Sequence, residues 1–189
     1  MSTKATKRED IERAAIELFG QRGFHGTSMP ELAKVAGVGP GTIYRHFQNK
    51  EALVNSLYQK WKMQLGTEVY MNLPMQGSWR ARFKGMWRGL FAFNANNPGV
   101  IDFLDFHHHG TYLDEQSKMI EAQSVTVLFA LVAGAQVEEI LVDLPPPALL
   151  AMAYSSFIGL VRAEREGYIQ LDEALISLTE ERVWAMIRR

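Results

Sequence analysis

Apolar residues recur at intervals of three and four along most of the chain, and Gly or Pro marks the breaks between runs. This period is typical of amphipathic helices, whereas a half-buried strand alternates at every second residue. No stretch alternates convincingly, so the chain is expected to be all-α, with about nine helices. They are expected from Lys7 to Gly23, from Ser28 to Gly37, from Pro40 to Phe47, from Lys50 to about Tyr70, and near residues 78–95, 98–108, 114–142, 146–166 and 172–188.

The first two helices begin with capping signals. Thr6 and Glu9 have the Thr-x-x-Glu spacing of a capping box, and Ser28 and Glu31 repeat it with Pro30 in the first turn. In such a box each side chain accepts a hydrogen bond from the backbone near the other, which satisfies two N–H groups. Both helix starts are therefore predicted within a residue or two.

The third helix is short and has a bare first turn. Gly39 is a permissive N-cap, Pro40 takes the first helical position, and Gly41 keeps the side chain minimal. Ile43 and Phe47 lie four residues apart and are expected to face the core. Left outside are Thr42, Tyr44, Arg45 and His46. Two short helices joined by a Gly-containing turn and braced by a first helix predict a helix-turn-helix, whose second helix enters the major groove of DNA.

Charge distribution supports this prediction. The net charge is only −1 over 189 residues, but residues 1–65 carry a net +4 and residues 66–189 a net −5. A basic front end suits contact with phosphates. The chain has no cysteine, which excludes disulfides and thiolate metal sites and fits a reducing cytoplasm.

The chain is predicted to be cytoplasmic and to have no membrane partner. Its first residues do not show the apolar core of a secretory signal. The most apolar run, from Val125 to Val137, is too short to span a bilayer and contains Gln136, so a buried helix is expected there.

Many residues of the first 55 resemble the N-terminal signature of the tetracycline-repressor (TetR) family. They are Gly23, Thr27, Ser28, Leu32, Ala33, Ala36, Gly37, Val38, Gly41, Thr42, Ile43, Tyr44, His46, Phe47, Lys50 and Leu53. The resemblance implies an all-helical homodimer that represses transcription from a double-stranded DNA operator until a small-molecule effector releases it. It places the helix-turn-helix DNA-binding domain at residues 1–50 and a helical ligand-binding and dimerisation domain at residues 51–189.

The resemblance also implies roles in DNA binding for seven residues. Thr42 and Arg45 are candidates for base contacts, and the candidates for phosphate contacts are Thr27, Ser28, Tyr44, His46 and Lys50. The sequence departs from the family at two positions: Gly39 replaces a frequent Ser, and Pro40 replaces a frequent polar or basic residue. These departures bear on base specificity more than on DNA binding itself.

Bulky side chains are dense in the second part of the chain. Most are expected in the ordinary core, and the resemblance implies that some line an effector pocket. The candidates are Phe83, Trp87, Phe91, Phe103, Phe106, His107, Tyr112, Phe129, Tyr154 and Phe157. Such a lining favours an apolar or aromatic ligand over a strongly charged one.

The last two helices are predicted to form the dimer interface. Ala151, Ser155, Gly159 and Ala163 are small residues at a strict spacing of four, which lets another helix approach closely. Leu175 and Leu178 add an apolar surface on the last helix. The alternative is that both helices pack only within their own subunit, and the resemblance favours the dimer.

The run Asp-Phe-Leu-Asp-Phe-His-His-His-Gly from Asp102 raises a second hypothesis from another class. Asp102, Asp105 and His109 share one helical face, so a metal-dependent hydrolase using His107–His109 is the alternative function. The chain has no phosphate-binding glycine loop, Gly-x-Ser-x-Gly elbow or zinc-protease pattern. The expectation is therefore a regulator that is not an enzyme, with no cofactor and no metal. A regulator that binds DNA without responding to a ligand is the remaining alternative.

Overall fold

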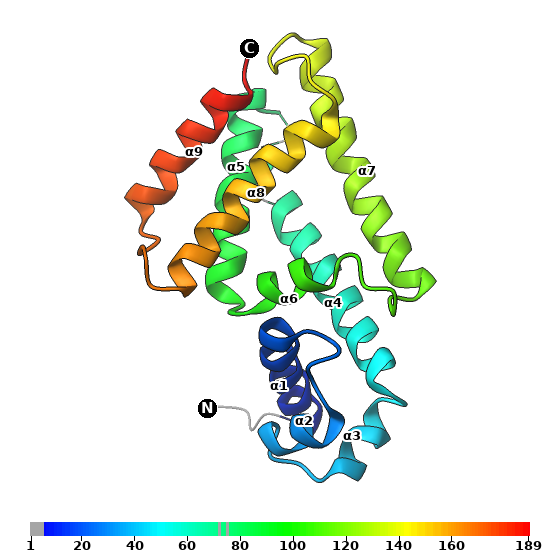
Figure 1. Cartoon of the computed structure of the whole chain (residues 1–189). Helices are drawn as coiled ribbons and strands as arrows, with labels where there is room; N and C mark the ends of the chain where they lie inside the picture. Colours follow the sequence, from blue (N-terminus) through cyan, green and yellow to red (C-terminus); the bar gives the residue numbers. More distant parts are fainter. Residues whose placement is uncertain (1–5, 72, 75) are drawn as a thin grey trace. The chain divides into compact units, whose positions relative to one another are not determined.

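The computed structural model describes residues 6–71, 73–74 and 76–189. These residues form nine α-helices and no strand, as the apolar period predicts (Figure 1). The helices are α1 (Lys7–Arg22), α2 (Met29–Val35), α3 (Pro40–His46), α4 (Lys50–Met71), α5 (Trp79–Asn96), α6 (Val100–His107), α7 (Glu115–Val137), α8 (Pro146–Arg165) and α9 (Glu173–Ile187).

The helices divide into two compact units that are not contiguous in sequence. The N-terminal unit combines the chain up to Gln64 with Asn97–Glu121, and the C-terminal unit combines Leu65–Asn96 with Ala122–Arg189. Helices α4 and α7 each have one end in either unit. The domain boundary expected at residue 50 lies within the N-terminal unit, because α6 and the segment that follows it pack with α1 and the start of α4.

The core of the N-terminal unit lies where α1 meets α6. Ile11, Ala15 and Phe19 of α1 are fully buried, and the rings of Phe19 and Phe103 have centroids 6.5 Å apart. A Cβ added at Gly20 would lie 3.5 Å from the backbone of Gly99 and 3.5 Å from that of Phe103. This close approach explains why the first helices are not a self-contained bundle.

Local signals fix the starts of the first two helices. The capping box of α1 is present, with Thr6 accepting from the amide of Glu9 and the Glu9 carboxylate accepting from the amide of Thr6 at 2.7 Å. Ser28 accepts from the amide of Glu31 at 3.3 Å, while the Glu31 carboxylate pairs with Arg22. The second cap is therefore formed by the serine, and its glutamate ties α2 to the end of α1.

Helix α7 ends earlier than expected. The predicted helix of residues 114–142 stops at Val137, because Glu139 adopts a left-handed conformation with φ of 56°. The amide of Ile140 then donates to the carbonyl of Ala135 at 3.0 Å, which closes the helix end. An apolar run gave no sign of this turn, since a non-glycine residue in this region is uncommon.

The prediction that the apolar run from Val125 to Val137 is a buried helix is wrong. Helix α7 is long and apolar enough, by length and composition alone, to cross a membrane, and only 11% of its most apolar 18-residue stretch is buried. One side of this stretch lines a cavity described below, and the opposite side, with Val127, Ala130 and Val137, is exposed. The apolar composition of this run therefore does not predict its burial within a single chain.

An aromatic row forms the core of the C-terminal unit. Ring centroids lie 5.9 Å apart between Phe83 and Trp87, 5.4 Å between Trp87 and Phe91, and 5.0 Å between Phe91 and Phe157. The indole N–H of Trp87 donates to the carbonyl of Ile176 at 3.2 Å, so its polar atom is satisfied in the core. The row joins α5 to α8 and α9.

A buried ion pair also joins α5 to α9. The guanidinium of Arg80 donates to both carboxylate oxygens of Glu180, and its carbon lies 5.4 Å from the ring centroid of Trp184. The two partners differ in exposure: the side chain of Glu180 is 2% exposed and that of Arg80 is 36% exposed. Breaking the pair from either side should therefore have unequal effects.

We expect Arg80→Ala to lower the free energy of unfolding by about 3 kcal/mol and Glu180→Ala by about 1–2 kcal/mol. The first variant leaves a buried carboxylate unpaired, whereas the second leaves a guanidinium that can reach water. Arg88→Ala is the matched control, because its partner Glu173 is 72% exposed and such pairs contribute little. Urea unfolding measures all three, and equal losses for Arg80→Ala and Glu180→Ala would contradict the interpretation.

Candidate DNA-binding surface and ligand cavity

Helix α3 presents a polar surface on an apolar base. Ile43 is fully buried and Phe47 is 5% exposed, which anchors the helix as its spacing predicts. Tyr44 is 54% exposed, Arg45 is exposed, and Thr42 is half-buried. The structure therefore brings together, on one short helix, four of the seven residues that sequence assigns to base and phosphate contacts: Thr42, Tyr44, Arg45 and His46.

The first turn of α3 is open. A Cβ added at Gly39 or at Gly41 would meet no atom within 4 Å, so these glycines are not required by packing inside the chain. No side chain caps the helix at Gly39. Bare backbone at the start of a reading helix lets another surface come close.

His46 points partly inward. The residue is half-buried, and its Nε2 atom is buried with no hydrogen-bond partner among the described residues. Its ring lies 6.5 Å from that of Phe47.

Thr27 and Ser28 differ in position although they are neighbours. Thr27 is 1% exposed, and its hydroxyl lies 3.0 Å from the carbonyl of Gly23 and 3.3 Å from that of Leu18, to which it donates. Ser28 is exposed and caps α2. The Thr27 side chain therefore braces the turn after α1, and the structure does not place it at the surface where a phosphate could reach it.

Lys50 also has partners inside the protein. Its ammonium donates to the carbonyls of Phe24 at 2.8 Å and Thr27 at 3.0 Å, and lies 4.1 Å from the centroid of the Phe24 ring. An ammonium has three N–H donors, and two of them hold this turn. Lys50 therefore fixes the start of α4 to the segment that leads into α2.

The predicted pocket residues fall into separate groups. Phe103, Phe106, His107 and Tyr112 belong to the N-terminal unit, where Phe103 and His107 pack against α1. Trp87, Phe91 and Phe157 form the core row of the C-terminal unit, Phe129 is half-buried on α7, and Tyr154 is 36% exposed. Among these predicted residues, Phe83 alone lines the cavity described below.

His107 is enclosed by aromatic rings. It is fully buried, with ring centroids 4.7 Å from Phe103, 5.9 Å from Phe19 and 5.5 Å from Tyr112. Nδ1 of His107 and the hydroxyl of Tyr112 share a hydrogen bond. Burial lowers the pKa of His107 to about 4, and a contact with the backbone of Phe19 opposes this only in part. The imidazole is therefore neutral at physiological pH.

The other two histidines do not complete a metal site. His108 contacts the backbone carbonyl of Asp105 through Nδ1, and its ring lies 3.8 Å from that of His109. Among the described residues, no group of three His, Asp or Glu side chains has the arrangement that holds a metal ion. The shared helical face of Asp102, Asp105 and His109 is therefore not a ligand cluster in this fold.

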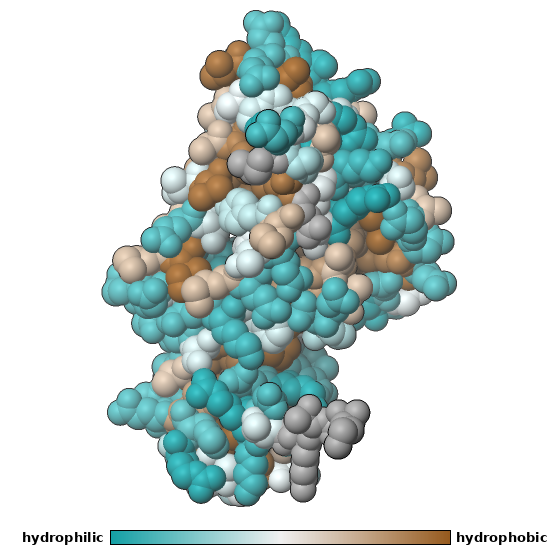
Figure 2. All heavy atoms as spheres, turned by 180° about the vertical axis from the view of Figure 1, so that it is seen from behind, coloured by the Kyte–Doolittle hydropathy of each residue, from teal (hydrophilic) through white to brown (hydrophobic). Residues whose placement is uncertain are grey.

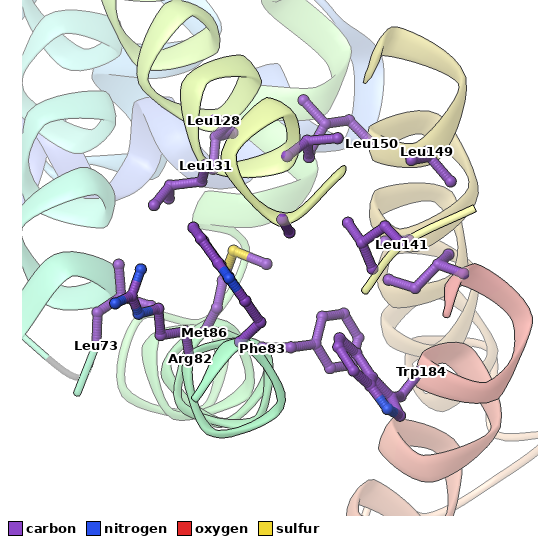
Figure 3. A pocket seen from close by; sticks show the side chains of 15 residues that line it. Leu73, Arg82, Phe83, Met86, Leu128, Leu131, Leu141, Leu149, Leu150 and Trp184 are labelled. Carbon is purple, nitrogen blue, oxygen red and sulfur yellow. The ribbon is translucent and has the colours of Figure 1, made fainter. Parts of the chain in front are cut away.

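A cavity of about 70 Å³ lies within the C-terminal unit (Figure 3). Helices α5, α7, α8 and α9 and the segments next to them contribute to its walls. The lining residues are Leu73, Trp79, Arg82, Phe83, Met86, Leu128, Leu131, Val132, Ala135, Leu141, Leu149, Leu150, Ala153, Trp184 and Ile187. Apart from Arg82, every lining side chain is apolar or aromatic.

Arg82 is engaged at the edge of this cavity. Its Nε atom donates to the carbonyl of Gly77 at 3.2 Å, and its guanidinium carbon lies 4.3 Å from the ring centroid of Trp79. Trp79 in turn lies over Gly134 of α7, where an added Cβ would come within 2.9 Å of the indole. Gly134 therefore leaves room for the ring that forms one wall.

Sequence reasoning missed most of these lining residues because it weighed aromatic bulk. A usable signal was present in α7, where Leu128, Leu131, Val132 and Ala135 recur at intervals of three and four. Aliphatic stripes of this kind also occur in ordinary cores, so the spacing alone does not distinguish a cavity wall. The distinction depends on how the facing helices fill the space between them.

The predicted dimer residues lie mostly at the surface. Ala151, Ser155 and Gly159 are exposed along α8, and a Cβ added at Gly159 would meet no atom within 4 Å. Leu178 on α9 is 49% exposed, and Ala163 and Leu175 are half-buried. Apolar side chains also gather in patches among hydrophilic ones on the face shown in Figure 2.

Two family models match almost the whole chain. The model described as "Bacterial regulatory proteins, tetR family" matches residues 11–57. The model described as "Tetracyclin repressor-like, C-terminal domain" matches residues 58–189. The first match contains α2, α3 and most of α1.

Similarity to individual curated proteins is confined to a shorter region. The HTH-type transcriptional regulator UidR of Escherichia coli (strain K12) is 43% identical over 58 residues, which are 30% of either protein. The fatty acid metabolism regulator protein of Bacillus subtilis (strain 168) is 40% identical over 60 residues, 32% of this chain and 31% of that protein. The chain thus spans about a third of the length of the curated relatives it matches.

Solved structures match over nearly the full length. A TetR family transcription regulator from Marinobacter aquaeolei VT8 has a TM-score of 0.82 at 19% identity, covering 96% of this chain and 95% of that one. The ketosteroid transcriptional regulator KstR2 of Mycobacterium tuberculosis has a TM-score of 0.79 at 16% identity, covering 99% and 97%. At such identities the likeness shows the fold, and it confirms the expected all-α architecture.

The buried His107 should make stability depend on pH. Its pKa is about 4 in the folded protein and 6.5 in an unfolded chain, so below pH 6.5 the unfolded state binds the proton. We expect about 3 kcal/mol of unfolding free energy to be lost as the pH falls from 6.5 to 4. Urea unfolding at several pH values measures this loss, most of which falls above the range where carboxylates titrate.

Two variants isolate the contribution of His107. His107→Gln should remove the dependence on pH between 6.5 and 4.5, because the amide does not titrate, while His108→Gln at an exposed position should retain it. If His107→Gln keeps the same slope as the parent, another group is responsible.

Proposed function

Because the chain belongs to the tetR family of bacterial regulatory proteins, we propose that it is a repressor that binds operator DNA as a homodimer and is released by a small apolar effector. Members of this family are transcription regulators and not enzymes. The hydrolase alternative has no support, since the histidine run forms no ligand cluster. The observation that carries the proposal is the exposed polar surface of α3 on its buried base, within the region that the family model matches.

In this proposal α3 enters the major groove. Arg45 and Thr42 contact base edges, and Tyr44, His46 and Ser28 contact phosphates, in accord with their positions on α3 and at the start of α2. Lys50 contributes through its remaining N–H donor. The basic balance of residues 1–65, a net +4, attracts the duplex over a longer range.

The homodimer is proposed to form through α8 and α9. The open face of Gly159, the exposed Ala151 and Ser155 that precede it on α8 and the half-exposed Leu178 suit close approach of two helices. A two-fold dimer presents two copies of α3, so its operator is a pseudo-palindrome whose half-sites are about 34–36 Å apart or a multiple of that distance.

The cavity in the C-terminal unit is the proposed effector site. Its volume of about 70 Å³ is smaller than the roughly 300–1,000 Å³ of sites that hold drug-sized ligands. Its lining offers almost no hydrogen-bond partner, and burying a charge there would be costly. The effector is therefore a neutral apolar molecule, or one that inserts a single ring or a short alkyl chain. DNA and effector are both met in the cytoplasm.

The first test is selection of bound fragments from random DNA by the purified protein at physiological salt, followed by sequencing. The proposal expects a pseudo-palindromic duplex bound with a Kd of about 10⁻⁸ M or below. Binding that is weak, sensitive to salt and blind to sequence would refute specific regulation. Addition of the effector should then weaken binding; a protein that stays bound whatever occupies the cavity supports the ligand-independent alternative.

Arg45→Ala should relax specificity at one base position of each half-site. Loss of a bidentate contact costs about 1–3 kcal/mol for the preferred base and little for the others. Selection repeated with the variant measures this, and Lys34→Ala, an exposed lysine on α2, serves as the control. A variant that selects the parent's duplex with unchanged preference at every position would show that Arg45 does not read a base.

Ala153→Leu should abolish effector binding while leaving operator binding intact. Ala153 lines the cavity, and a leucine there adds three carbons to its wall, which leaves less room for a ring. Toluene is a suitable neutral probe, and at about five times its Kd it should stabilise the parent by about 1 kcal/mol. Benzoate, of similar size but charged, should have no such effect. Thermal unfolding measures both.

The matched control for this variant is Ala92→Leu, an exposed position on α5. It should respond to toluene as the parent does. A toluene response that persists in Ala153→Leu would place the binding site elsewhere.

A further inference from the structure

Tyr112, in the segment between α6 and α7, contacts the turn that connects α1 to α2. Its ring stacks on that of Phe24, with centroids 4.0 Å apart and planes inclined by 18°. The two residues are 88 positions apart in sequence. Among the ring pairs described in the N-terminal unit, only the adjacent His108 and His109 lie closer.

Three contacts fix the position of Tyr112 itself. Its hydroxyl hydrogen bonds with His107 at the end of α6, and its backbone carbonyl accepts from the side-chain amide of Asn55 at 2.9 Å. Gly110 lies beneath the ring, where an added Cβ would come within 2.5 Å of it. The ring is therefore a rigid part of the segment and not a loosely attached side chain.

Asn55 connects this segment to α4 with all of its hydrogen-bonding capacity. Its amide N–H₂ group donates to the carbonyls of Glu51 and Tyr112, both at 2.9 Å. Its oxygen accepts from the amide of Asp114 at 2.9 Å and from the hydroxyl of Ser117 at 2.7 Å. A buried amide with four satisfied bonds specifies one arrangement of the groups around it.

Phe24, on which Tyr112 stacks, opens the turn that leads from α1 to α2. Its carbonyl accepts from Lys50, as does that of Thr27. The turn is therefore held from α4 by the lysine and from the segment before α7 by the tyrosine. Since α2 begins directly after it and packs against α3, the shape of this turn contributes, together with the contacts of α1, to where α3 lies relative to α4.

We propose that Tyr112 is a positioning residue for DNA recognition: by stacking on Phe24 it fixes the turn between α1 and α2, and with it the orientation of α3. This proposal rests on the proposed DNA-binding function. Tyr112 itself touches no DNA. It acts through Phe24, and loss of the stack permits several orientations of α3 in place of one.

Hydrogen exchange of the free protein tests the first half of the proposal without DNA. Tyr112→Leu removes the stack, and amides of residues 24–36 should exchange about tenfold faster than in the parent. Amides of Ile11–Phe19, in the core of α1, report global unfolding and should change less. Tyr112→Phe keeps the stack and should resemble the parent, as should Tyr168→Leu, whose residue is 78% exposed.

Binding to two duplexes tests the second half. For Tyr112→Leu, the Kd for the duplex recovered by selection should rise about tenfold, while the Kd for a random duplex changes less than twofold. The reason is that phosphate attraction survives a misoriented α3, whereas base contacts do not. Tyr112→Phe should keep the parent's ratio of the Kd for the selected duplex to the Kd for the random duplex. A protein that is merely destabilised would not show this dependence on the ring.

Gly110→Ala reaches the same contact by another route, because its Cβ displaces the Tyr112 ring. It should reproduce both effects of Tyr112→Leu. Gly66→Ala is its control, since a Cβ there meets only Tyr70, at 3.9 Å.

The outcomes separate the two proposals. Exchange that rises equally at all amides, or a Kd that rises equally for both duplexes, overturns the positioning role. A parent protein that selects no duplex overturns the proposed function. In that case faster exchange confined to residues 24–36 still shows that Tyr112 orders the turn, while unchanged exchange there refutes that as well.

Discussion

The packing of α1 against α6 is the contact on which the N-terminal unit depends. Gly20 lets the backbones of α1 and α6 approach closely, and the ring of Phe19 packs against the rings of Phe103 and His107. Without this contact α1, which also packs against α2 and α3, would expose the side that packs on α6. The position of the exposed surface of α3 therefore relies on residues that lie about sixty positions further along the chain. The neutral His107 belongs to the same contact, because a charge at its centre would be desolvated without a partner.

Much of the fold follows from local chemistry and could be predicted from the sequence. Capping residues such as Thr6 and Ser28 place helix starts, since a few hydrogen bonds within four residues decide them. The base of α3 follows from the spacing of Ile43 and Phe47. The end of α7 could not be predicted from the sequence, because Glu139 adopts a left-handed conformation that is uncommon for a residue with a side chain. The exposure of α7 could not be predicted either, because an apolar run does not indicate which neighbouring elements cover the helix.

The same distinction between local signals and tertiary packing applies to the predictions for the candidate site. Exposure of Tyr44 and Arg45 depends on helical period, which the sequence carries. The partners of Thr27 and Lys50 depend on tertiary packing, which it does not: both side chains turn toward carbonyls of the same turn. Aromatic residues were expected to line a cavity, yet Trp87 and Phe91 pack tightly in a row. Flat rings stack efficiently on one another, so a space is more readily left where the branched aliphatic side chains of α7 and α8 form part of the wall.

The non-contiguous N-terminal unit has a consequence for how this protein can be recombined with its relatives. A helix-turn-helix exchanged by cutting the chain near residue 50 would carry α1 away from its own α6 and place it against a foreign one. Gly20 and Phe19 would then meet residues selected for a different partner. The piece that can be exchanged as a unit consists of two segments, the chain up to Gln64 and Asn97–Glu121. New specificity acquired by shuffling must therefore bring both segments together, whereas substitution on the exposed side of α3 needs neither.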